Sequence, residues 1–147
     1  MLGDVGLGLI EQGHKVADTL PAVERFDLAP QLRRSSKRTP ANIAEGYGRY
    51  HYLDSLRFYY IARGSLNETI NHVISARDLG YLNGEWYQRL YELGREAERA
   101  LNGYIAYVWQ QRQGHVAYGQ RILAEDDASY RLSPSDSADE ATETQSP

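Results

Sequence analysis

Apolar residues recur every three or four positions along most of this chain, which is the period of one face of an α-helix. The clearest case is the segment 85–113, whose apolar positions are Trp86, Leu90, Leu93, Ala97, Leu101, Tyr104 and Val108. Alternating steps of four and three are typical of the seam of a left-handed helix bundle. No segment alternates strictly between apolar and polar residues, so the pattern predicts no strand.

Turn and cap residues divide this pattern into four helices. Pro21 ends the first helix, because a proline interrupts the helical hydrogen bonds, and Gly80 is a good C-terminal cap for the third. The glycine-rich start, residues 1–8, is expected to fray. The predicted helices cover residues 9–20, 27–48, 52–79 and 85–113. We therefore predict an all-α protein with one folded domain, residues 1–113, that forms an antiparallel up-down-up-down four-helix bundle.

The segment from Gln31 to Arg49 has the least usual composition for a helix. Pro40 lies inside it and cannot donate a hydrogen bond to the carbonyl of Ser36, so the helix should kink there or restart with Thr39 as its cap. Gly46 loosens the end of the same helix. Because so many unusual residues occur in one helix, we assign Pro40 and Gly46 a structural or interface role.

Further small and polar residues mark expected packing positions. Gly64 and Ser65 lie in the middle of the third helix, where we expect them to let the helix that holds Gly46 approach closely. Asn42 and Glu45 lie beside the apolar face, each four residues from an arginine on the same helix. For these two residues we favour a hydrogen-bond network that fixes the helix register, and contact with a ligand or RNA is the alternative.

Basic residues interleaved with tyrosines give the strongest functional signal. Arginine neutralises phosphates and tyrosine offers a stacking face to an unpaired base, but both are also enriched at protein–protein interfaces. The chain has 12 Tyr and only 2 Phe, which favours apolar surfaces that need a hydrogen-bonding tip. We favour self-association, with RNA or DNA contact and a purely intramolecular role as alternatives. The candidate residues are Arg33, Arg34, Lys37, Arg38, Arg49, Arg57 and Arg63 for partner binding and Tyr59 for an interface.

Several motifs occur in a fixed order along the chain. They are Leu32-Arg33-Arg34, Pro40-x-Asn42-Ile43-Ala44-Glu45-Gly46-x-Gly48-Arg49, Ile61-Ala62-Arg63-Gly64-Ser65-Leu66-Asn67-Glu68 and Arg77-Asp78-Leu79-Gly80-Tyr81-Leu82. As a set they resemble the four-helix bundle proteins related to the 23S ribosomal RNA intervening-sequence protein, over about residues 9–112. The first helix lacks the aromatic opening usual in that family, and Thr39 stands where a small aliphatic residue is commoner.

This resemblance implies a function. Proteins of this family are similar to the accessory protein of diversity-generating retroelements, which forms a ring-like pentamer and binds a reverse transcriptase and nucleic acid. We therefore expect a non-enzymatic, homo-oligomeric scaffold, with a pentamer favoured, that binds RNA or a ribonucleoprotein enzyme such as a reverse transcriptase. The rival interpretation is a small monomeric RNA-binding module.

Composition argues against several other classes of function. The chain has no cysteine, so disulfides and thiolate chemistry are excluded and a reducing cytoplasm is the expected location. A di-metal carboxylate site in a helix bundle needs two Glu-x-x-His pairs, and only Glu11 and His14 have that spacing. We expect no catalytic residue, metal, cofactor or small-molecule substrate. No apolar run approaches the roughly 20 residues of a membrane helix, so no membrane partner is expected.

Charge divides the chain into two parts. Residues 1–112 carry a balance of +1, whereas residues 113–147 carry −5. An acidic tail on a near-neutral body argues against a protein that coats nucleic acid generally, although a local basic patch remains compatible with it. Residues 114–147 are predicted to form a largely disordered tail, because a segment dominated by Ser, Asp, Glu, Thr and Pro cannot bury enough apolar surface to offset its ordering entropy.

A chain that ends at Gln113 should therefore keep the thermal midpoint of the full chain within about 3 °C, since the residues beyond it are expected to bury little surface. Calorimetric scans of the two proteins at equal concentration measure the difference. A much larger drop in the truncated protein would mean that the tail docks on the bundle.

Overall fold

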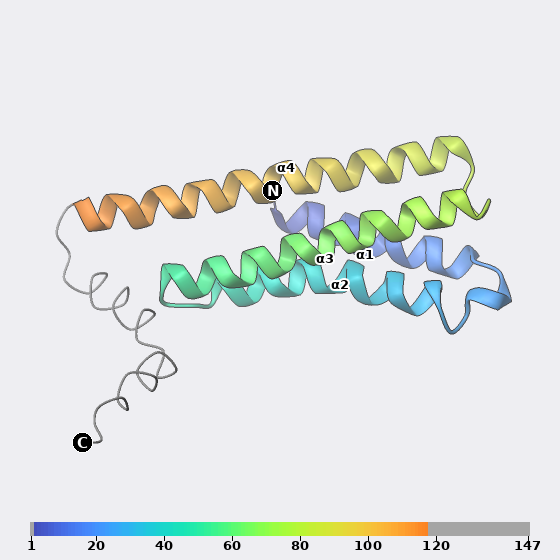
Figure 1. Ribbon diagram of the computed structural model, residues 1–147, viewed down its shortest axis with the longest axis horizontal. Coiled ribbons are helices and arrows are strands. Elements are labelled where there is room, and N and C mark those ends of the chain that lie inside the picture. The colour runs from blue at the N-terminus through green and yellow to red at the C-terminus, as the bar shows by residue number, and fades with distance from the viewer. Residues whose placement is uncertain (1, 118–147) are drawn as a thin grey trace, which may run out of the picture. The chain divides into compact units, whose positions relative to one another are not determined.

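Four long helices and one turn of 3-10 helix make up the described chain (Figure 1). The computed structural model describes residues 2–117. The elements are α1 (Leu2–Thr19), η1 (Ala22–Glu24), α2 (Leu28–Tyr47), α3 (Tyr52–Asp78) and α4 (Gly84–Ala117). No strand occurs within residues 2–117, so the predicted all-α class is confirmed.

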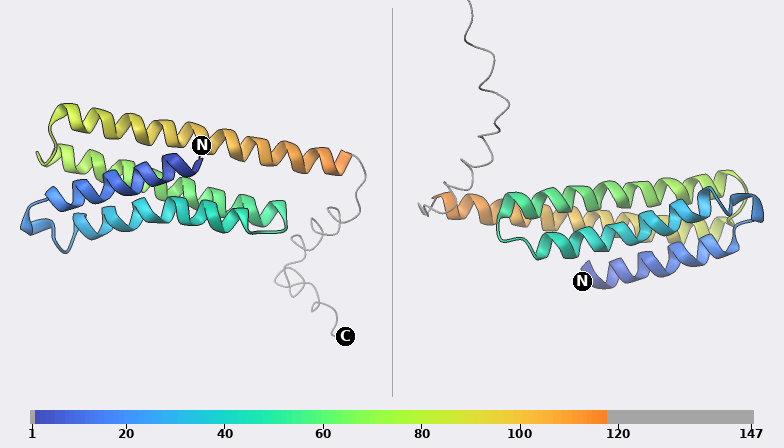
Figure 2. Two further views of the ribbon diagram at one scale, coloured as in Figure 1. Left: turned by 180° about the vertical axis from the view of Figure 1, so that it is seen from behind. Right: turned by 90° about the horizontal axis from the view of Figure 1, so that it is seen from below.

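Successive helices within residues 2–110 run in opposite directions and lie side by side (Figures 1 and 2). The connections are short and lie at alternate ends, so the prediction of an antiparallel four-helix bundle is confirmed for this unit. Residues 111–117 belong to a second unit and continue α4 as helix. The predicted disordered tail beyond Ala117 lies outside the described residues.

Three clusters of buried side chains form the core, and α1 takes part in only two of them. One cluster lies near the α1–α2 linker and contains Val16, Leu32, Ala76 and Leu90; a second contains Leu9, Leu66, Ile70 and Ala97. The third contains Leu56, Tyr59, Ala62, Leu101, Ile105 and Val108, all from α3 and α4. The helix-bundle core is therefore completed by α1 along only part of its length. The apolar residues that recur at helical spacing along α3 are all buried: Tyr59, Ala62, Leu66, Ile70, Val73 and Ala76.

Helix α1 begins at Leu2, so the expectation that residues 1–8 fray was wrong. Two glycines explain the difference, because they let α1 approach α2 closely. A Cβ atom at Gly6 would lie 3.0 Å from the Cβ of Pro40, and one at Gly13 would lie 2.8 Å from the Cβ of Ser36. Glycine costs about 1 kcal/mol of helix propensity relative to alanine, and packing against α2 overrides that local cost.

Helix α2 continues through Pro40 as a single helix, so the predicted restart at this residue does not occur. Thr39 is not a cap: its side chain is buried, and its hydroxyl donates to the carbonyl of Ser35 at 3.4 Å. The hydroxyls of Ser35 and Ser36 also donate to carbonyls one turn earlier, at 3.3 and 3.1 Å. These hydrogen bonds satisfy the polar groups that α2 buries against its neighbours.

The close crossing of α2 and α3 lies at Gly46 and Tyr59. A Cβ atom at Gly46 would lie 2.5 Å from Cε1 of the Tyr59 ring, which is itself buried. Gly64 is exposed and has no atom within 4 Å of its Cβ position, so the expectation that a helix of the bundle packs closely on it was wrong. Ser65 is buried, as a packing position requires.

Gly46→Ala should lower the free energy of unfolding by about 1–3 kcal/mol, because the added methyl group overlaps a tyrosine ring that has no room to move. Gly64→Ala is the matched control and should be neutral or raise stability by up to about 1 kcal/mol through helix propensity. Urea midpoints of the two variants and the parent protein measure both effects. Equal stability of Gly46→Ala and the parent would contradict a tight crossing at Tyr59.

Candidate interaction surfaces

The solvent-facing side of α2 carries three cations that have no acidic partner. Arg34, Lys37 and Arg38 are exposed and lie within about one helical turn of each other. None of the three forms an ion pair with any residue in the range 2–117. This group is called the cationic stripe below. Unpaired cations on one helix face are suited to an anionic partner.

Asn42 and Glu45 make contacts with residues four positions away in the chain. Arg49 donates to the carboxylate of Glu45 at 2.5 Å, which is the pair that their spacing predicts. The Asn42 amide donates to the backbone carbonyl of Arg38 at 2.7 Å, so it leaves the Arg38 guanidinium available. Both contacts are local, and the role predicted for these two residues in fixing the helix register stays a prediction.

Arg33 and Arg63 bind side chains of other helices, whereas Arg57 lies at a pocket. Arg33 forms an ion pair of 2.6 Å with Asp18 of α1, and Arg63 donates to Asn102 of α4 at 3.2 Å. Arg57 is exposed and lines a pocket of about 580 Å³ between α3 and α4. Of the seven predicted basic residues, three form the cationic stripe and two, Arg33 and Arg63, connect helices. Arg49 pairs locally with Glu45, and Arg57 lines the pocket.

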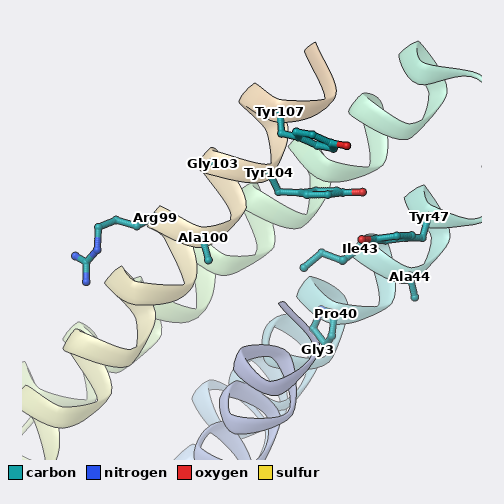
Figure 3. Close-up of a pocket in the computed structure, with 10 residues that line it drawn as sticks. All are labelled: Gly3, Pro40, Ile43, Ala44, Tyr47, Arg99, Ala100, Gly103, Tyr104 and Tyr107. Atoms are coloured by element: carbon teal, nitrogen blue, oxygen red, sulfur yellow. The ribbon is translucent and has the colours of Figure 1, made fainter. Parts of the chain in front are cut away.

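An apolar groove with a volume of about 850 Å³ lies between α2 and α4 (Figure 3). It begins at Gly3, near the start of α1, and extends along the part of the bundle that α1 does not cover. We call it the α2–α4 groove. Its lining residues are Gly3, Pro40, Ile43, Ala44, Tyr47, Arg99, Ala100, Gly103, Tyr104 and Tyr107. The volume lies within the range of protein sites that hold a ligand or an apolar side chain of a partner.

Stacked tyrosines form one end of the α2–α4 groove. The rings of Tyr47 and Tyr104 stack with centroids 5.4 Å apart, and Tyr107 stacks on Tyr104 at 6.1 Å. The ring of Tyr59, which is buried in the core, meets the Tyr104 ring edge-on with centroids 5.1 Å apart. Tyr47 and Tyr107 remain exposed. The stack therefore connects the core to a solvent-facing aromatic surface.

Sequence reasoning assigned Tyr104 to the core seam and did not identify Tyr107, Arg99 or Gly103. A signal was present, because Ala100, Gly103 and Tyr107 follow the helical spacing of a second small or aromatic stripe beside the core stripe of α4. What the sequence could not show is that only the first turn of α1, at Gly3, reaches this stripe, so that α1 leaves the rest of the stripe uncovered.

Burial and hydrogen bonds with Tyr47 and Tyr59 raise the pKa of Tyr104 well above the ordinary tyrosine value. Burial also raises the pKa of Tyr59. Both raised pKa values favour the neutral phenol at Tyr59 and Tyr104.

The sequence model of the 23S rRNA-intervening sequence protein family matches residues 6–103. Among solved structures, the chain is similar to a protein of unknown function from the S23 ribosomal protein family of Bacteroides thetaiotaomicron, with a TM-score of 0.67 and 22% identity over 71% of this chain and 98% of that one. At this identity the likeness shows the fold alone. No curated protein sequence matches.

The remaining observations concern residues 2–117, the part of the chain that the structure describes. No helix in this range is both long and apolar enough to span a bilayer. No group of three or more His, Asp or Glu side chains in the same range could hold a metal ion.

Stability should decrease as pH rises above about 10, the ordinary tyrosine pKa. The raised pKa of Tyr104 means that its contribution is fully present below that pH and is lost as pH rises toward the folded-state pKa, because the unfolded chain releases the proton first. Tyr104→Phe should therefore make unfolding free energy less dependent on pH between about 10 and 11. Urea unfolding at several pH values measures the slope, with the exposed Tyr50→Phe as control; equal slopes in all three proteins would contradict the assignment.

Proposed function

This chain belongs to the 23S rRNA-intervening sequence protein family, and we propose that it is a non-enzymatic, homo-oligomeric helical scaffold in the cytoplasm. Its partner is RNA or a ribonucleoprotein enzyme such as a reverse transcriptase, and a pentamer is the favoured assembly. The motifs resemble this family, whose members are similar to the accessory protein of diversity-generating retroelements, and that resemblance supports this choice. The single observation that carries the proposal is the cationic stripe of α2.

The cationic stripe suits a phosphate backbone because its charges are not neutralised within the chain. Arg34, Lys37 and Arg38 are exposed and free of acidic partners in the described range, whereas Arg33 and Arg49 are held by Asp18 and Glu45. Each phosphate that a cation neutralises releases bound counterions. The logarithm of the binding constant should therefore fall linearly with the logarithm of the salt concentration. Three contacts to a single strand correspond to a slope of about −2.

Exposed aromatic and apolar side chains support the self-association part of the proposal. Tyr47 and Tyr107 border the apolar α2–α4 groove, and Val23 and Phe26 are exposed in the α1–α2 linker. The groove with its two tyrosines is a contiguous apolar surface, and such a surface marks interaction sites more often than scattered apolar residues do. Tyrosine is also among the residues enriched at protein interfaces.

A monomeric RNA-binding module is the second candidate, favoured by the same cationic stripe without any need for self-association. The two candidates differ in their mass in solution. Sedimentation at two protein concentrations distinguishes them, because only an associating scaffold gives a mass above that of one chain.

Replacing Lys37 and Arg38 by Gln should weaken RNA binding and reduce the salt slope by roughly one unit per lost phosphate contact, with the mass in solution unchanged. Fluorescence anisotropy of a labelled single-stranded RNA at several salt concentrations measures both quantities. The matched control removes two cations that are paired inside their own helices, Lys15→Gln and Arg89→Gln, and should leave the slope near its parent value.

Two other results for the variant with Gln at positions 37 and 38 would change the interpretation of the cationic stripe. A lower mass together with weaker RNA binding would mean that the cationic stripe serves assembly and that RNA affinity falls through lost avidity. If neither mass nor affinity changes, the stripe is only a solvated helix face and the RNA part of the proposal is wrong.

A further inference from the structure

We propose that the α2–α4 groove holds an unpaired base of single-stranded RNA, which stacks on the tyrosines of the groove while nearby cations hold the adjoining phosphates. The inference rests on the RNA binding proposed above, and it names the class of RNA and the site that contacts the base. Three observations support it: parallel exposed tyrosine rings, space beside them, and cations without acidic partners on the same surface.

The first observation concerns Tyr47, Tyr104 and Tyr107, which together are called the tyrosine stack below. Figure 3 shows the three rings edge-on and almost parallel. The ring planes of Tyr47 and Tyr104 differ by 11°, and those of Tyr104 and Tyr107 by 28°. A further planar ring can extend such a stack, because aromatic rings favour offset parallel contact with centroids about 4.5–7 Å apart. An aliphatic side chain would gain little from parallel faces, so the arrangement favours a planar aromatic partner.

The groove has space for a base beside the tyrosine stack. Its volume of about 850 Å³ lies within the range of sites that hold drug-sized ligands, and a base with its ribose is no larger than these. The α4 wall is low at Ala100 and Gly103, and Ala44 gives the α2 wall a small side chain (Figure 3). A planar ring can therefore reach the groove from solvent without displacing a bulky side chain at these three positions.

Cations accompany the groove on both of its walls. Arg99 lines the α4 wall, is exposed, and extends outward from it (Figure 3). Lys37 of the cationic stripe precedes Ala44 by seven residues, so the two lie on the same face of α2, about 10 Å apart along the helix axis. Neither Lys37 nor Arg99 has an acidic partner in residues 2–117. A strand whose base lies in the groove can therefore continue along α2 with its phosphates beside the cationic stripe.

The lining of the groove is compatible with a polyanion. None of the ten residues that line it is acidic, and the single charged one is Arg99. A strand that enters the groove therefore meets no negative charge among these residues. An apolar, aromatic lining beside cations is the combination by which proteins bind single strands, because the rings stack on bases and the cations neutralise phosphates.

The inference requires single-stranded RNA, because duplex RNA keeps its bases paired and stacked inside the helix. A protein surface contacts the duplex mainly through its phosphates and 2′-hydroxyls, whereas unpaired bases can turn outward and stack on aromatic side chains. The cationic stripe recognises phosphate charge, which both forms of RNA carry. Any preference for the single strand should therefore come from the tyrosine stack.

Tyr107→Leu tests the inference because it removes an exposed ring from the tyrosine stack. Tyr107 is 51% exposed and lies outside the core clusters, so the fold should tolerate the change. Fluorescence anisotropy of a labelled single-stranded RNA should show binding about tenfold weaker than that of the parent protein, as the loss of one base–aromatic contact predicts. The dependence of affinity on salt should keep its parent slope, since no phosphate contact is lost.

Matched variants separate stacking from other effects of the substitution. Tyr107→Phe keeps the ring and should bind the single strand as the parent protein does. Tyr50→Leu removes a tyrosine that is 81% exposed and does not line the groove, and it should also keep the parent affinity. With the same RNA sequence in duplex form, the parent protein and Tyr107→Leu should bind equally well.

A fluorescent base gives a direct measurement of stacking. When 2-aminopurine replaces adenine in the single strand, its fluorescence should fall on binding to the parent protein, because stacking on an aromatic ring quenches it. At saturating protein the quenching should be much smaller for Tyr107→Leu. It should be unchanged for the variant with Gln at positions 37 and 38, whose loss lies in the phosphate contacts.

The outcomes separate this inference from the proposed function. A parent protein that binds no RNA overturns both. If Tyr107→Leu and Tyr47→Leu match the parent protein in affinity for the single strand and in quenching, the inference is wrong and the cationic stripe alone binds RNA. A lower mass in solution for Tyr107→Leu also overturns it, because the groove would then serve self-association. If adenosine monophosphate alone bound as tightly as the single strand, the groove would hold a free nucleotide, and RNA as its occupant would be wrong.

Discussion

The close approach of α2 to both α1 and α3 is the packing constraint on which the rest of this structure depends. It is made possible by positions without side chains: Gly13 faces Ser36 on one side of α2, and Gly46 faces Tyr59 on the other. Buried hydroxyls replace larger apolar groups along the contact, and each is satisfied by a carbonyl of its own helix. Helix α2 is therefore held on two sides by small residues. The solvent-facing side of α2 carries the cationic stripe. Helices α1 and α3 pack on the other sides of α2, so they place no acidic side chain against these cations.

The same constraint explains why the aromatic surface lies where it does. In this part of the bundle α4 packs on α3 through larger side chains such as Leu101 and Ile105. Beyond the first turn of α1, no helix of the described residues fills the space between α2 and α4. Tyrosines suit such a position, since one edge of each ring can join the core while the hydroxyl end stays hydrated or hydrogen-bonded. Tyr59, Tyr104 and Tyr47 follow this progression from the buried core to the exposed surface.

Much of the fold could be predicted from the sequence because helical spacing is a local property. The apolar stripe of α3 and the bounds of α2 and α3 agree with the structure to within one residue. The start of α1 could not be predicted, since the helix-breaking tendency of glycine is local but the packing that overrides it comes from α2. For the same reason the sequence could not tell Gly46, which faces a tyrosine ring, from Gly64, which faces solvent. Arg33 forms an ion pair because Asp18 of α1 lies beside it, whereas Arg34 has no acidic neighbour in the described residues. The two residues are of the same type and adjacent in the sequence, so the sequence could not show which of them is paired.

The first turn of α1 lies at one end of the α2–α4 groove, where Gly3 lines it, and this position has a consequence for protein engineering. Any helical residues fused ahead of Leu2 would continue the axis of α1 and run directly along the groove (Figure 3). An affinity tag at the amino terminus is therefore not a neutral addition to this protein, because a tag that extends the helix would act as a built-in competitor for whatever binds there. Separating the tag from α1 by a proline that stops the helix avoids this interference.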